Sequence, residues 1–205
     1  MDDIVRVSPP LSMDEKTAVV GVAETRRHLR ISSTDEDRLL AEDIEAAYDF
    51  LSGRDGWLGR MCLLEEEWIA YFPSAPNKTF EIPMRPLVEL TGIGWLQPDG
   101  SYVDVEGANY YVTGGPFSLV QRAPTSWWPY SGMPQQRAYQ VRFRAGWGLS
   151  KESIPSTIRK AIRMLVGHWY NQRETTGSEG RTAGREVEYG LKKLCGRYRI
   201  GPDHS

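Results

Sequence analysis

The residues that could form a thiol or imidazole site are few and scattered along the chain. The cysteines are Cys62 and Cys195, and the histidines are His28, His168 and His204. A thiol beside an imidazole base could act as a nucleophile, but no neighbouring residues indicate an activated thiol. No cysteine–histidine pair has the spacing of zinc ligands. We therefore expect no metal site, no cofactor and no structural disulfide framework.

The run Glu65-Glu66-Glu67 is the other concentration of groups that could do acid–base chemistry. Adjacent residues of a strand face opposite sides of a sheet, so the run does not make a paired acid and base. We expect it to form a solvent-exposed edge. The sequence also contains no phosphate-binding loop, dinucleotide-binding fingerprint or nucleophile elbow. The protein is therefore expected not to be an enzyme, with no catalytic residues.

The aromatic run Trp127-Trp128-Pro129-Tyr130 could bind a ligand by stacking. Exposed tryptophans stack on sugars or unpaired bases, which would make a carbohydrate- or nucleic-acid-binding module. They also fill domain cores and the centres of subunit interfaces. Because the surrounding loop is rich in Pro, Ser and Gly, we favour an interface or core role for Trp127 and Trp128.

Composition indicates a folded domain with two oppositely charged ends. The chain has 205 residues, 40% hydrophobic and 11% aromatic, with no apolar run long enough to span a bilayer. Its N-terminus lacks the features of a signal peptide, so cytosolic synthesis is expected. Residues 1–56 carry 7 Lys/Arg against 13 Asp/Glu, whereas residues 151–205 carry 11 against 6. Such polarity suits contacts between subunits, although ordinary solvated helix faces would also produce it.

Helical periodicity occurs on both sides of a central segment. Residues 1–18 contain Pro9-Pro10 and little periodicity, so they predict an extended arm. Apolar stripes predict a small bundle with helices at about 22–30, 34–52 and 155–173, the second capped by the Thr34 hydroxyl. The residues expected to face inward are Val22, Ala23 and Leu29 in the first helix, Leu40, Ile44, Ala47 and Leu51 in the second, and Ile158, Ile162, Leu165 and Trp169 in the third.

The central segment, residues 61–145, changes to short runs of β-branched and aromatic residues. Alternation is clearest in Tyr139–Ala145, where Tyr139, Val141 and Phe143 share one face. We predict an antiparallel region of about five strands inserted into the bundle, an α+β fold. Residues 19–173 would then form one domain with the β-insertion at 61–145.

The C-terminal segment, residues 174–205, is predicted to be a flexible linker followed by a docking element. Residues 174–184 are rich in Thr, Ser, Gly and charges, which is typical of a linker. Residues 187–198 could form a short helix with one apolar stripe. Docking of this helix onto another chain is favoured, and folding back onto the same core is the alternative.

The order of several short motifs resembles the head–tail connector (adaptor, or head-completion) proteins of long-tailed bacteriophages, prophages and gene transfer agents. The most specific motif is Val141–Gly148, ending in Ala-Gly-Trp-Gly and leading into Ile154-Pro155 and His168-Trp169-Tyr170. Shorter matches precede it at residues 22–31, 35–47, 59–60, 82–87 and 99–100. The resemblance covers residues 17–175.

The resemblance implies a structural subunit of a ring of about twelve copies beneath the portal of a capsid. The ring would extend the channel through which genomic double-stranded DNA passes without specific binding, and would join the portal to the next neck or tail protein. The protein would be located in the virion neck and, during assembly, in the host cytoplasm, with no membrane partner. Another neck component, a stopper or tail terminator, is the alternative, although such proteins usually centre on a β-barrel and lack the long helix at 155–173.

Two groups of residues are the predicted contact sites of such a subunit. The C-terminal docking segment for the portal comprises Leu191, Leu194, Arg197, Tyr198, Arg199 and Ile200. The subunit-interface candidates are Trp127, Trp128, Arg159, Arg163, Asp35 and Asp37. The acidic and basic ends of the chain could supply the complementary flanks that a ring subunit needs.

Overall fold

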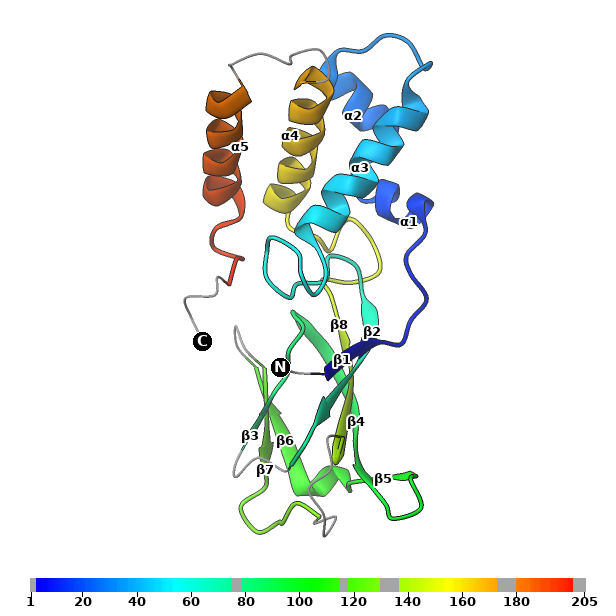
Figure 1. Cartoon of the computed structure of the whole chain (residues 1–205), viewed down its shortest axis with the longest axis vertical. Helices are drawn as coiled ribbons and strands as arrows, with labels where there is room; N and C mark the ends of the chain where they lie inside the picture. The colour runs from blue at the N-terminus through cyan, green and yellow to red at the C-terminus, as the bar shows by residue number, and fades with distance from the viewer. Residues whose placement is uncertain (1–2, 75–78, 115–117, 130–136, 173–179, 201–205) are drawn as a thin grey trace. The chain divides into compact units, whose positions relative to one another are not determined.

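The computed structural model has the expected α+β fold and describes residues 3–74, 79–114, 118–129, 137–172 and 180–200, with only the backbone for 180–186 (Figure 1). The chain divides into two compact units. The β-unit comprises Met1–Pro9 and Leu64–Trp147, and the helical unit comprises Pro10–Leu63 and Gly148–Ser205. The β-rich segment thus lies close to the expected bounds of 61–145.

The helical unit is built around α4, which contacts α2, α3 and α5. Its helices are α1 (Met13–Ala18), α2 (Val22–Leu29), α3 (Asp37–Leu51), α4 (Ser156–Gln172) and α5 (Gly180–Cys195). The predicted apolar stripes of α3 and α4 form its core. The buried stripe residues are Leu40, Ile44, Ala47, Leu51, Ile158, Ile162 and Leu165. Trp169, the last predicted member, is only half-buried and packs edge-on against Phe50 of α3, with ring centroids 6.4 Å apart.

Three local predictions for the first helices are wrong. Residues 13–18 are helical rather than extended, because Ser12 and Glu15 form a reciprocal capping box at the start of α1. In α2, Ala23 is exposed and Thr25 is the buried residue. Helix α3 begins at Asp37, and Thr34 contributes its backbone carbonyl to the Asp37 amide rather than a hydroxyl cap.

The β-unit contains more strands than the five expected, arranged in two antiparallel sheets. The first sheet has the order β1-β2-β8-β4-β5 and the second the order β3-β7-β6. The strands of the first sheet are β1 (Asp3–Arg6), β2 (Glu66–Phe72), β8 (Tyr139–Ala145), β4 (Leu87–Leu96) and β5 (Tyr102–Asp104). Those of the second are β3 (Thr79–Glu81), β7 (Leu119–Arg122) and β6 (Tyr110–Thr113), with a short 3₁₀ turn, η1 (Gly107–Asn109), before β6.

Strand β8 is the central strand of the larger sheet and pairs with β2 and β4. Its predicted inward face is confirmed, because Tyr139, Val141 and Phe143 are buried, but Gln140 on the opposite face is buried as well. Phe80 of β3 is also buried, and its ring lies 5.8 Å from that of Tyr139. An aromatic cluster therefore links the second sheet to the core of the first.

The Ala-Gly-Trp-Gly motif at the end of β8 has a backbone explanation. Gly146 has φ +145°, and its amide donates to the Pro86 carbonyl at 2.8 Å. A Cβ atom at this position would lie 2.4 Å from the Leu64 carbonyl oxygen. Gly148 has φ +141°, and a Cβ there would meet the Ser153 hydroxyl at 2.7 Å. Both positions therefore require glycine, which explains this part of the motif by local sterics.

Candidate interaction surfaces

The two cysteines do not form a reactive site. Cys62 and Cys195 are both buried, and neither forms a disulfide. Burial raises the pKa of Cys195 to about 11, and its sulfur lies 3.9 Å from the Thr157 carbonyl, which accepts its weak hydrogen bond. A thiol with a raised pKa stays protonated at neutral pH and is a poor nucleophile. Within the described part of the chain, no group of three or more His, Cys, Asp or Glu side chains is placed to hold a metal ion.

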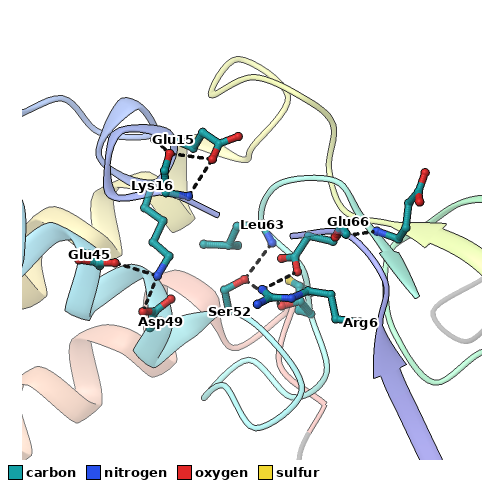
Figure 2. Close-up of polar contacts among 12 residues, drawn as sticks. Arg6, Glu15, Lys16, Glu45, Asp49, Ser52, Leu63 and Glu66 are labelled. Carbon is teal, nitrogen blue, oxygen red and sulfur yellow. Dashed lines mark hydrogen bonds and ion pairs between the residues drawn. The ribbon is translucent and has the colours of Figure 1, made fainter. Parts of the chain in front are cut away.

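The glutamate run is not the exposed edge that the sequence indicated. Glu66 is buried, and its carboxylate accepts a hydrogen bond from Arg6 of β1 at 3.2 Å (Figure 2). Glu65 is half-buried and pairs with Arg144 of β8. Only Glu67 is exposed. The carboxylates of Glu65 and Glu66 therefore have structural partners within the β-unit, and a catalytic role is not needed to explain them.

Two arginines of β8, Arg142 and Arg144, are neutralised in the same way. Arg144 also donates to Glu89 at 2.6 Å, and this hydrogen bond, together with the charge of Glu65, raises the pKa of Arg144. Arg142 pairs with Asp104 of β5. Both arginines therefore form ion pairs with acidic side chains from neighbouring segments.

The structure separates the two tryptophans of the aromatic run. Trp128 packs against Phe80, with ring centroids 5.0 Å apart, and belongs to the aromatic cluster of the β-unit. Trp127 is 83% exposed, and the Arg122 guanidinium lies 5.0 Å from its ring centre. Trp127 is therefore the member of the pair that remains available for a partner, whereas Trp128 is already packed within its own unit.

Two charged interface candidates have ionic partners inside the helical unit. Asp37, at the start of α3, accepts two hydrogen bonds of 2.8 Å from the Arg26 guanidinium of α2. Arg163 of α4 pairs with Glu24 of α2. These pairs tie three helices together, so both residues have a structural role whether or not they also contact another subunit.

The other two charged candidates are differently placed. Asp35 is exposed in the turn before α3, where its amide donates to the Ser33 hydroxyl at 3.1 Å. Arg159 is half-buried on α4, and its Nε is enclosed without a hydrogen-bond acceptor among the described residues. Their assignment to a subunit interface stays a prediction.

A third ionic cluster, which the sequence did not indicate, fixes α1 onto α3. The Lys16 ammonium donates to Asp49 at 2.7 Å and to Glu45 at 3.0 Å (Figure 2). Burial lowers the pKa of Lys16, but the hydrogen bonds and charges of the two carboxylates outweigh it and leave the pKa raised. Lys16 lies 29 residues before Glu45 and 33 residues before Asp49, so no local sequence pattern could have identified these contacts.

The C-terminal helix is longer than predicted and packs onto its own unit. Helix α5 begins at Gly180, so residues 180–184, expected to be linker, are helical; residues 173–179 lie outside the described part. Leu191 is 3% exposed, and Gly190 is so close to α4 that a Cβ atom there would lie 2.8 Å from the Met164 sulfur. Folding back, the alternative left open by the sequence, is therefore what the structure shows for this helix.

The remaining docking candidates lie at or beyond the end of α5. Leu194, Tyr198, Arg199 and Ile200 are half-buried, and Arg197 is exposed. The Arg199 guanidinium lies 4.6 Å from the Trp57 ring centre, and the Ile200 amide donates to the Leu58 carbonyl at 3.2 Å. Portal docking by this segment stays a prediction, and Leu191 could take part only if α5 left α4.

Several exposed apolar residues were not singled out from the sequence. Leu39 and Phe50 on α3 and Tyr189 on α5 are among the exposed large hydrophobic residues. Each lies off the buried stripe of its helix, which is the pattern that could have identified it.

No helix of the described residues is long and apolar enough to cross a membrane.

Solved structures share this fold over nearly the whole chain. A chain from the neck of an empty gene transfer agent particle, computed with C6 symmetry, is 19% identical, with a TM-score of 0.71 over 97% of this chain and 95% of that one. A chain from the virion of a native gene transfer agent particle is also 19% identical, with a TM-score of 0.70 over 97% of this chain and 96% of that one. A chain from the neck of the native particle, computed with C12 symmetry, is 18% identical, with a TM-score of 0.70 over 97% of this chain and 95% of that one. No protein-family model and no curated protein matches the sequence. At this identity the likeness establishes the shared fold.

Proposed function

We propose that this chain is a head–tail adaptor: a structural subunit of a ring in the neck of a tailed bacteriophage or gene transfer agent particle. The observation that carries the proposal is the match, with a TM-score of 0.71 and 97% coverage, to a chain of a gene transfer agent neck. The match spans both units of the chain rather than one common substructure. Fold alone does not imply function, so further support comes from the motifs and surfaces.

The motif order supports the same assignment independently of the overall fold. The Ala-Gly-Trp-Gly motif lies at the junction where the chain leaves the β-unit after Trp147. Its glycines are required by local sterics, so the motif marks a backbone geometry that adaptor-like chains would have to share. The amphipathic helix that follows, α4, is the central helix of its unit.

In this proposal the ring contains about twelve copies and lies between the portal and the next neck or tail protein. The segment Arg197–Ile200, at the end of α5, would contact the portal. The ring would surround DNA without binding it tightly. The pairing of the β8 arginines Arg142 and Arg144 with acidic side chains is consistent with this, because paired arginines are less available to phosphates. No enzymatic step is part of this function.

The proposal predicts a specific assembly defect. Deleting the gene from a producing strain should leave DNA-filled capsids and free tails that do not join, and supplying the chain should restore joining. Electron cryomicroscopy of restored particles should show a ring of this chain directly beneath the portal. A ring at the tail-proximal end of the neck would instead identify a stopper or terminator, and normal joining without the chain would refute a neck function.

A short C-terminal truncation tests portal docking. Removing all residues after 175 would delete α5 and expose the face of α4 that it covers, so the result could reflect misfolding. Ending the chain after Gly196 keeps α5 and removes the segment Arg197–Ile200. We expect this variant to fold and to fail in joining; a folded variant that joins normally would refute docking by this segment.

A further inference from the structure

The exposed face of α3 combines acidic and apolar side chains. Leu39, Glu42, Ala46 and Asp49 are exposed and follow one another at intervals of three or four residues, and Phe50 is exposed four residues after Ala46, so all five lie on one face of the helix. Two large apolar groups stand on this face, of which Phe50 is 43% exposed. The whole of α3 carries five Asp/Glu against one Lys/Arg. Glu42 pairs with Arg38 of the same helix, and two cations from other helices pair with α3: Arg26 with Asp37, and Lys16 with Glu45 and Asp49. With five acids against these three cations, α3 keeps a net charge of −2.

The exposed face of α5 has the complementary character. Tyr189, Lys192 and Lys193 are exposed, and both lysines lie about one helical turn after Tyr189. Tyr189 is 61% exposed, and the Lys193 ammonium lies 5.0 Å from its ring centre. Residues 187–200 carry four Lys/Arg against one acid, Glu188, which pairs with Lys192 at 2.8 Å.

The position of α4 places these two faces on different sides of the helical unit. Helix α4 contacts both α3 and α5 and lies between them in Figure 1. The side of α5 that carries Leu191 and Cys195 is turned inward and buried, so the side with Tyr189 and Lys193 is directed away from α4. A subunit with two different complementary faces can make head-to-tail contacts that close into a ring.

We propose that the acidic face of α3 in one copy receives the basic face of α5 in the next copy. This inference rests on the proposed ring and names its subunit contact. The apolar groups Leu39, Phe50 and Tyr189 lie at the centre of the contact, and the charges around them fix its orientation. A nucleic acid does not fit as the occupant of both faces, because the acidic α3 face repels phosphate.

Charge reversal on each face, separately and together, tests the contact. The α3 set is Glu42→Lys with Ala46→Lys, two exposed positions chosen because they leave Leu39, Phe50 and the Lys16 cluster intact. The α5 set is Lys192→Glu with Lys193→Glu. Each set alone should reduce the number of joined particles at least about tenfold in a strain that lacks the native gene, which corresponds to a loss of about 1.4 kcal/mol. The two sets together should restore joining to within about threefold of the native level.

Controls separate this inference from the proposed function. Each variant chain is purified and its unfolding in urea compared with that of the native chain; Lys192→Gln with Lys193→Gln replaces the α5 set if that set does not fold. If deletion of the gene blocks joining but either folded set joins normally, the contact is wrong and the neck function stands. Failure of the combined sets to restore joining also refutes the contact. If deletion of the gene does not affect joining, the proposed function itself fails.

Discussion

Replacing Leu191 by alanine tests whether α5 belongs to the folded helical unit or hangs free as an arm. Leu191 is 3% exposed, and Cys195 one turn later is fully buried. The close approach of Gly190 to Met164 leaves little space between α5 and α4. An alanine at 191 would therefore leave a cavity that the backbone can close only in part.

The expected loss of stability follows from that geometry. Buried leucine-to-alanine changes cost about 2–5 kcal/mol, and the lower part of the range applies to a helix packed on one side only. We expect about 2.5 kcal/mol, which lowers the melting temperature of a chain of this size by about 5–10 °C. A free arm would give no measurable change.

Urea unfolding of the isolated subunit, followed by tryptophan fluorescence and circular dichroism, measures this difference. The matched control is Tyr189→Ala, two positions earlier and exposed, which should stay within about 0.5 kcal/mol of the native chain. If Leu191→Ala also stays within about 0.5 kcal/mol, α5 does not pack on α4 in solution, and the docking arm expected from the sequence would be the better description.

Other residues give three further predictions. Gly146→Ala should destabilise the β-unit by at least about 3 kcal/mol in urea unfolding, because its Cβ atom would clash with the backbone. The control Gly100→Ala has φ +85° but open space around it, and should cost only about 1 kcal/mol. Equal effects of the two changes would contradict a steric cause. Cys62 and Cys195 should not react with a thiol reagent in the native chain, because both are buried and the pKa of Cys195 is raised to about 11, and both should react after unfolding; rapid labelling of the native chain would show that the burial is wrong. Lys16→Met should cost about 1 kcal/mol at neutral pH. Since the folded-state pKa of Lys16 is raised above its ordinary value of 10.5, its contribution is complete below that value and is lost as the pH rises through the raised pKa, so native and variant stabilities should converge in alkali.

Features that depend on local periodicity could be predicted from the sequence. The buried residues Leu40, Ile44, Ile158 and Ile162 follow from a repeat of 3.6, and the buried face of β8 follows from a repeat of two. These repeats reflect which side of an element meets the core, and that information lies within a few residues of chain.

Features that depend on distant partners could not be predicted in this way. The glutamate run looked exposed because the arginine that pairs with Glu66 lies 60 residues earlier, in β1. Residues 3–6 looked like an arm because a strand at a sheet edge needs its neighbour to be recognised, and that neighbour is β2. Trp127 and Trp128 are adjacent and chemically identical, so only the position of Phe80 separates the packed one from the exposed one.

The connectivity of the two units affects how the subunit would carry a load. The polypeptide passes between the units three times, after Pro9, after Leu63 and after Trp147. A protease cut at any one crossing leaves two intact covalent connections, so the units stay joined. Tension applied to one unit and resisted by the other would be divided among three peptide segments, with β1 held to β2 along four paired residues at the first of them. In the proposed adaptor, such redundancy would be an advantage, because the subunit would hold a capsid to its tail.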